Sequence, residues 1–165
     1  MRTGWSVVVG VLVLLGGVGA LPAQTSPKRV ISLAAADKIA AAAEAEAKKR
    51  GSTVVIVVVD DGGYPIVLRR LDDTQVASVE VGIAKARTAA IFRRPSRIFE
   101  EQVRNGRLAT LVLPGAAPLQ GGVPLVYEGK VIGAIGVSGN SPQEDEEIAL
   151  AGAAVAETAF RGTTP

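Results

Sequence analysis

The chain has 165 residues, and its 18 Lys and Arg against 16 Asp and Glu give a formal net charge of +2. This near balance, with no basic stripe interleaved with aromatic residues, does not indicate nucleic-acid binding. The sequence has no His and no Cys, and its single Met is the initiator, Met1. These absences exclude disulfides, Ser-His-Asp and Cys-His catalytic sites, and structural zinc held by Cys or His. Among the common axial ligands of haem iron, they leave only Tyr.

The first segment is typical of a secretory signal peptide. Arg2 supplies a positive charge, residues 5–15 are almost wholly apolar, and small residues lead up to Ala23. The apolar run is short for a transmembrane helix, although an uncleaved membrane anchor is the alternative. The sequence therefore predicts an exported protein, periplasmic or extracellular. It divides into a signal peptide (1–23), a flexible N-terminal tail (24–30) and one domain (31–162).

The first half of the domain predicts one helix and one hairpin. Ser32 is a suitable N-cap for a helix that ends at Gly51, which suits the C′ position. Residues 53–59 form a β-branched run without alternation, which predicts a central strand buried on both faces. A turn follows, and residues 64–71 form the returning strand, with Pro65 favouring an edge position.

The second half predicts more helices and a second hairpin. Apolar residues recur at helical spacing, and short runs of β-branched and aliphatic residues indicate strands. The expected elements are helices over 76–92 and 96–105, strands over 108–113, 123–127 and 130–137, and a last helix over 142–160. The order α-β-β-α-α-β-β-β-α predicts an α+β fold, with a five-stranded antiparallel sheet flanked by helices.

The glycine-rich turn before the last helix raises the question of nucleotide binding. Its spacing, from Gly133 to Gly139, differs from dinucleotide and P-loop patterns. Four carboxylates, at positions 144–147, occupy the positive end of the helix dipole and would repel phosphate. Ser141 and Glu144 form a capping box instead. A sharper alternative is a weak metal site in which Glu144 and Glu147 chelate a hard cation, and its competitor is a solvated helix cap.

Tyr64 is the first candidate for ligand chemistry. It follows a Gly-Gly turn, and Arg69 and Arg70 lie on the same hairpin arm. A tyrosinate ligates ferric haem, and a nearby arginine would stabilise the anion. The alternative is an edge-strand aromatic that covers the sheet. Tyr127, beside the second hairpin turn, is predicted to be a packing residue.

Lys85 is the second candidate, because it interrupts a stretch of small, apolar helix residues. There it would point into a groove and bind a propionate or a small carboxylate as a point charge. The alternative is a lysine whose stem lies on the surface while its ammonium reaches water. Arg70 either assists such a site or forms a structural ion pair with Asp72.

Six segments taken together resemble the GlcG/HbpS-like family, also called the haem-degrading domain family. The resemblance covers residues 31–158, and it rests on the order and spacing of the segments rather than on any single one. The segments are Asp60-x-Gly62-Gly63, Arg70-Leu71-Asp72, Lys85-Ala86-x-Thr88-Ala89, Gly121-Gly122-x-Pro124, Gly133-x-Ile135-Gly136-x-Ser138-Gly139, and Asp145-Glu146 with Ala151-Gly152.

The resemblance implies a profilin-like fold, homo-oligomers that are often octamers, and haem binding in secreted members that work with a two-component sensor system. The chain departs from related haem-binding domains in having no His ligand. Thr110 is a loose candidate for the hydroxyl-type haem contact of the secreted member.

Three hypotheses follow for the function. The first is an exported, non-enzymatic, oligomeric binding protein for haem or a similar small ligand. The second is a metal-independent enzyme or binding protein for small carboxylate metabolites, using Lys85 and Arg70. The third is a structural or signalling oligomer that contacts a membrane sensor.

Overall fold

The computed structural model describes residue 24 and residues 26–161. In it, two antiparallel hairpins build a four-stranded sheet. The predicted signal peptide, 1–23, lies outside these described residues. The strand order is β2-β1-β4-β3, and every pairing is antiparallel. The strands are β1 (Val55–Asp60), β2 (Pro65–Arg70), β3 (Gly122–Tyr127) and β4 (Lys130–Ser138).

The central strand β1 is buried on both faces, as its unbroken β-branched sequence predicts. Every residue from Val54 to Val59 has no exposed surface. The predicted edge position of β2 is also confirmed, since this strand begins at Pro65 and pairs only with β1 among the described strands.

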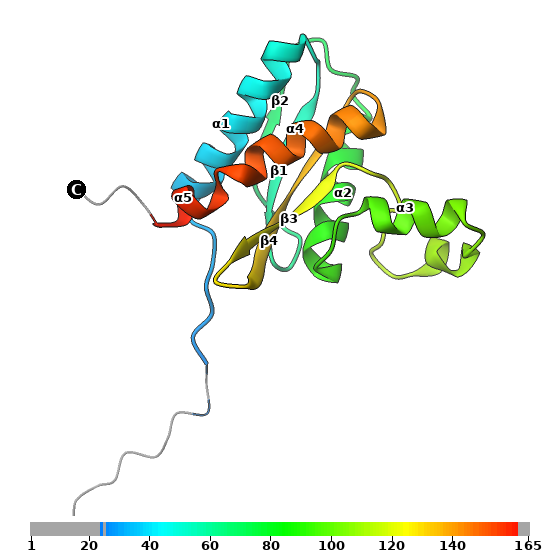
Figure 1. Ribbon diagram of the computed structural model, residues 1–165. Helices are drawn as coiled ribbons and strands as arrows, with labels where there is room; N and C mark the ends of the chain where they lie inside the picture. The colour runs from blue at the N-terminus through cyan, green and yellow to red at the C-terminus, as the bar shows by residue number, and fades with distance from the viewer. Residues whose placement is uncertain (1–23, 25, 162–165) are drawn as a thin grey trace, which may run out of the picture.

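Helices cover both faces of the sheet (Figure 1). On one face, α1 (Leu33–Arg50), α4 (Pro142–Ala154) and α5 (Ala156–Arg161) pack on the larger core, which contains Ile39, Ile56 and Ile148. On the other face, α2 (Ser78–Phe92) lies against Val55, Val57 and Val59 of β1 through small residues such as Ala86. Across the residues described, none of the helices has the length and apolar character needed to span a membrane.

The helix ends follow the predicted capping chemistry. The Ser32 side chain accepts a hydrogen bond from the Ala35 amide, and Gly51 ends α1 in the left-handed conformation. Ser141 accepts from the Glu144 amide at the start of α4. The last helix differs from its prediction, because it breaks at Val155 and continues as the short helix α5.

The predicted third strand, over residues 108–113, is wrong, so the sheet has four strands rather than five. The segment forms a 3-10 helix, η1 (Leu108–Val112), after α3 (Arg97–Arg104). These elements project from the body as an arm (Figure 1). Leu108, Leu111 and Val112 are exposed, and only Thr110 is buried. Strand propensity reflects packing on a pleated surface, and no neighbouring strand is within reach here to supply one.

Candidate functional site

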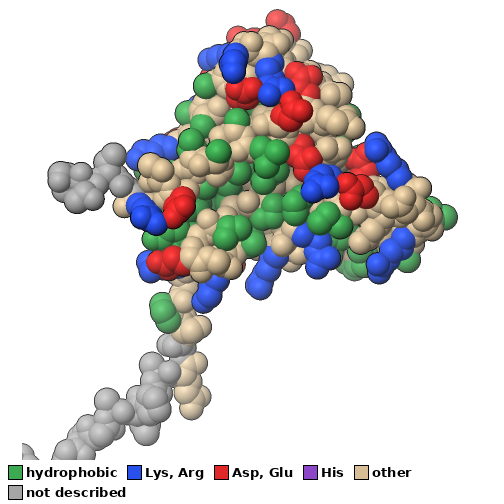
Figure 2. Space-filling view, in the orientation of Figure 1, with side chains coloured by type: hydrophobic (Ala, Val, Ile, Leu, Met, Phe, Trp, Pro, Cys, Tyr) green, Lys and Arg blue, Asp and Glu red, His purple; other side chains and the backbone are tan. Residues whose placement is uncertain are grey.

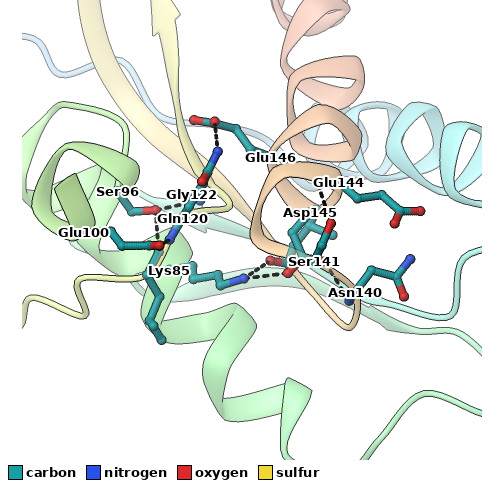
Figure 3. Close-up of polar contacts among 12 residues, drawn as sticks. Lys85, Ser96, Glu100, Gln120, Gly122, Asn140, Ser141, Glu144, Asp145 and Glu146 are labelled. Carbon is teal, nitrogen blue, oxygen red and sulfur yellow. Dashed lines mark hydrogen bonds and ion pairs between the residues drawn. The ribbon is translucent and has the colours of Figure 1, made fainter. Parts of the chain in front are cut away.

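A buried ion pair lies where the sheet, α2 and α4 meet. The ammonium of Lys85 donates hydrogen bonds to the Asp145 carboxylate at 2.7 Å and to the Val137 carbonyl oxygen at 3.1 Å. The Lys85 and Asp145 side chains are 5% and 2% exposed. The second Asp145 oxygen accepts from the Asn140 amide at 3.0 Å. One pair thus joins α2, the end of β4 and the first turn of α4 (Figure 3).

Two glycines let the backbone pass directly over this pair. A Cβ on Gly121 would lie 2.9 Å from the Lys85 Nζ and 2.8 Å from the Val137 oxygen, and the φ of Gly121 is +126°. A Cβ on Gly122 would lie only 2.1 Å from the Lys85 carbonyl oxygen. No side chain fits at either position, so the glycines and the ion pair form one closely packed unit.

The same unit fixes the base of the arm. Ser96 donates to the Leu119 carbonyl at 2.6 Å and accepts from the Gly122 amide at 2.8 Å. Glu100 of α3 accepts from the Gln120 amide at 2.6 Å, and the Gln120 side chain donates to Glu146 of α4 at 2.6 Å. Figure 3 shows these side chains converging between α3 and α4. Polar contacts therefore hold the arm against the start of α4.

Burial dominates the electrostatics of this centre. Removal from water raises the pKa of the Asp145 carboxyl, while the hydrogen bond and the charge of Lys85 oppose that shift. Because the ammonium is already paired and enclosed, the geometry serves to position α2, β4 and α4 relative to one another. The interpretation of a lysine reaching water is wrong, because the Lys85 side chain is only 5% exposed. Its role in binding a ligand stays a prediction, since the ammonium lies in no open groove of the part of the chain that the structure describes.

The centre collects four of the segments that carry the family resemblance. Lys85, the Gly121-Gly122 pair, Val137 within the Gly133–Gly139 segment, and Asp145 meet here, although Lys85 lies more than thirty positions before the others. The sequence does not predict the role of Asp145, which stands there only as part of one family segment. The signal that could have pointed to Asp145 is its place in the first turn of α4, on the side that faces the core, among acidic residues that are otherwise more exposed.

Tyr64 lies at the first hairpin turn with its side chain exposed, at 64%. Its basic neighbour is Arg87 of α2, whose guanidinium carbon lies 5.7 Å from the centre of the Tyr64 ring. Gly63 makes room for this arginine, since a Cβ there would lie 2.5 Å from Arg87 Cγ. Asp60 accepts from the Tyr64 amide at 2.9 Å, which fixes the turn.

The arginines predicted to flank Tyr64 have other partners. Arg69 bonds Glu44 at 2.7 Å and Asp37 at 3.2 Å on α1. Arg70 donates to the Thr74 carbonyl at 2.8 Å, and its expected ion pair with Asp72 does not form. Both lie at the opposite end of β2 from Tyr64, because six residues of extended chain separate the two ends.

The other candidates lie apart from one another. Thr110 is buried in the arm, where its hydroxyl donates to Gln102 at 3.0 Å. The rings of Tyr127 and Phe160 of α5 pack edge to face, with 5.6 Å between ring centres. Tyr64, Arg70, Lys85 and Thr110 therefore do not form one site within this chain.

The acidic start of α4 is used in contacts with the end of α1. Ser52 donates to Glu144, and Glu147 pairs with Arg50. Across the described part of the chain, no group of three or more acidic residues is arranged to hold a metal ion. The structure thus gives the two carboxylates protein partners, and chelation of a cation by Glu144 and Glu147 stays a prediction.

Comparison with known proteins places the chain in a family. Residues 31–154 match the family model described as "Haem degrading protein HbpS-like". Protein GlcG of Escherichia coli K12 is 46% identical over 77 residues, covering 47% of this chain. That match spans 58% of the length of GlcG.

Solved structures agree on the fold. A doubly substituted HbpS from Streptomyces reticuli is 33% identical and superposes with a TM-score of 0.74, covering 84% of this chain and 94% of HbpS. A PduOC:heme complex is 27% identical, with a TM-score of 0.69, and covers 76% of this chain and 94% of that one.

Proposed function

Because the chain belongs to the HbpS-like family, we propose that it is an exported, oligomeric protein that binds haem or a chemically similar small ligand. The observation that carries the proposal is the family match over residues 31–154, together with the likeness to a domain solved with haem. Export is supported by the charged and then apolar beginning of the sequence. Contact with a membrane sensor is part of the proposal and rests on family resemblance.

The side chains available to hold haem iron are few. With no His or Cys in the chain, the described residues offer two tyrosines among the common axial ligands. Tyr64 fits better than Tyr127, because its ring is exposed and carries an arginine above it, whereas Tyr127 packs against Phe160. We therefore propose that Tyr64 would hold the haem iron, with the Arg87 cation beside its ring.

The small-carboxylate alternative is less well supported. Lys85 is enclosed and paired with Asp145, so a ligand would have to displace a buried carboxylate to reach it. The Arg70 side chain donates its hydrogen bond to the Thr74 carbonyl instead, and Arg70 lies on β2 whereas Lys85 lies on α2. Nothing in this geometry favours an enzyme over a binding protein.

Exposed apolar side chains support the oligomeric part of the proposal. Leu108, Leu111 and Val112 all belong to η1 and are exposed at 63%, 55% and 79%. A further band of hydrophobic side chains crosses the face seen in Figure 2, where α4 and β3 lie. Contiguous apolar surface of this kind marks interaction sites, and we propose a second copy of this chain as the occupant on η1.

Titration of the purified protein with haemin tests the proposal. We expect a saturable change in the Soret band, and weaker binding by roughly tenfold in Arg87→Gln, which removes the supporting charge. Arg107→Gln is the matched control, since Arg107 is an exposed arginine on the arm. A spectrum equal to that of free haemin in buffer would contradict haem binding.

A further inference from the structure

We infer that the chain has an anion site at the end of the sheet where both hairpins turn, and that this site takes a small organic dicarboxylate with an apolar body. The inference goes beyond the proposed function, because it needs neither iron nor Tyr64. It rests on a hollow of about 810 Å³ between the hairpin turns, the end of α2 and residues 26–29.

The residues that line the hollow carry mostly positive charge. Four basic residues line it, against the single acidic residue Asp61. The basic residues are Lys28, Arg29, Arg93 and Lys130. Low-dielectric walls that carry one sign of charge concentrate the potential in a cleft and attract ions of the opposite sign. Figure 2 shows Lys and Arg side chains spaced along the lower edge of the molecule.

Two of the four cations are held in place by protein carboxylates. Lys28 pairs with Asp61 of the first hairpin turn at 2.8 Å, and Arg29 pairs with Glu128 of the second at 3.3 Å. The two pairs fasten residues 26–29 across both turns, so this segment forms one wall of the hollow.

The other two cations have no such partner. Within residues 26–161, no carboxylate lies at ion-pair distance from Arg93 or Lys130. Arg93 is held in the left-handed conformation, with φ +55°, at the end of α2. Both cations line the hollow, so their charge is available to a ligand there.

The inference that the ligand has an apolar body comes from a second, smaller hollow. It has a volume of about 120 Å³ and shares Arg29 and Ile132 with the larger one. Its walls include the rings of Tyr127 and Phe160, and Arg29 lies 5.6 Å from the centre of the Tyr127 ring. A ligand that spans both hollows meets cations on one side and aromatic and aliphatic surface on the other. Small-molecule sites commonly combine these features.

The class of ligand follows from the two unpartnered cations and the adjoining apolar walls. Two carboxylates match Arg93 and Lys130, and a flat apolar body matches the surface around Ile132. Salt will weaken the binding, because these side chains are solvated and the attraction between exposed charges is screened.

The test uses naphthalene-2,3-dicarboxylate as the probe, because both of its carboxylates lie on one edge of the ring system, in calorimetric titrations of the full-length protein at low ionic strength. We expect saturable binding, and roughly tenfold weaker binding in Arg93→Gln/Lys130→Gln. Arg107→Gln serves as the charge-matched control away from the hollow, and circular dichroism confirms that each variant is folded. Naphthalene-2,3-dimethanol, which has the same body without charge, should not bind measurably.

Three results would overturn the inference. They are an absence of saturable binding, equal affinity in the folded double variant, and equal binding of the neutral diol. The haemin titration is read separately. Haemin binding without dicarboxylate binding would contradict this inference and leave the proposed function supported. Dicarboxylate binding without haemin binding would support this inference and contradict the proposed haem binding.

Discussion

Lys85 and Asp145 stand 60 positions apart in the sequence, and in the folded chain their charged groups lie 2.7 Å from each other with almost no exposure to water. Attraction across this pair has to offset the cost of removing both charges from water. The importance of the pair is therefore clearest when one partner is removed, because the other charge is then left buried without compensation. This gives the first prediction.

Replacing Lys85 by Met leaves the Asp145 carboxylate buried without a cation. We expect Lys85→Met to lower the free energy of unfolding by about 3–5 kcal/mol, measured by urea denaturation. The double variant Lys85→Met/Asp145→Leu, which removes both charges, should recover part of the loss. The control Arg161→Gln breaks an exposed pair with Glu157 and should have a much smaller effect. A Lys85→Met variant as stable as the wild type would contradict this account of the pair.

The glycine beside the pair gives a second prediction. A Cβ at Gly122 would meet the Lys85 carbonyl oxygen at 2.1 Å, so Gly122→Ala must displace backbone. We expect a loss of about 3 kcal/mol or more in unfolding free energy. Gly106→Ala is the control, because Gly106 has positive φ and open space around it, and this variant should lose only about 1 kcal/mol. Equal losses would show that steric contact with Lys85 is not the cause.

The pKa of Asp145 gives a third prediction, about pH. Burial raises this pKa above 3.8, so the folded state holds the proton more tightly than the unfolded state does. The corresponding contribution to stability is fully present below the unfolded pKa and is lost as pH rises through the folded pKa. Carboxyl carbon chemical shifts should give Asp145 a titration midpoint above 3.8. A midpoint below that value would mean that Lys85 outweighs burial.

The exposed side chains of η1 give a fourth prediction. If a second copy covers Leu111 and Val112, then Leu111→Ser/Val112→Ser should shift sedimentation toward smaller species without unfolding the chain. Lys38→Ser, an exposed change on α1, is the control. An unchanged sedimentation coefficient in the double variant would place the interface elsewhere.

Local patterns in the sequence predicted most of the fold. Ser32, Gly51 and Ser141 mark helix ends by capping chemistry that acts within a few residues. The unbroken run in β1 and Pro65 in β2 identified a central and an edge strand. The predicted third strand failed at residues 108–113, because its side chains suit a strand but no partner strand lies beside it.

The candidate site was less predictable, because its contacts join residues far apart in the chain. Lys85 stood out as a charge among small residues, but its partner Asp145 became evident only when α2 and α4 were placed together. Tyr64 was matched to arginines on its own strand, whereas the structure supplies Arg87 from α2. Secondary-structure propensity and residue spacing are local, so they do not predict which side chain from a different helix or strand will lie beside a given residue.

The most direct test of the central claim is the resonance Raman spectrum of the ferric haem complex, recorded for the wild type and for Tyr64→Phe. Tyr127→Phe is the matched control. The account predicts iron–phenolate bands in the wild type and in Tyr127→Phe, and their loss in Tyr64→Phe. Phenolate bands that persist in Tyr64→Phe, or that are absent from the wild-type complex, would contradict the assignment of Tyr64 as the ligand.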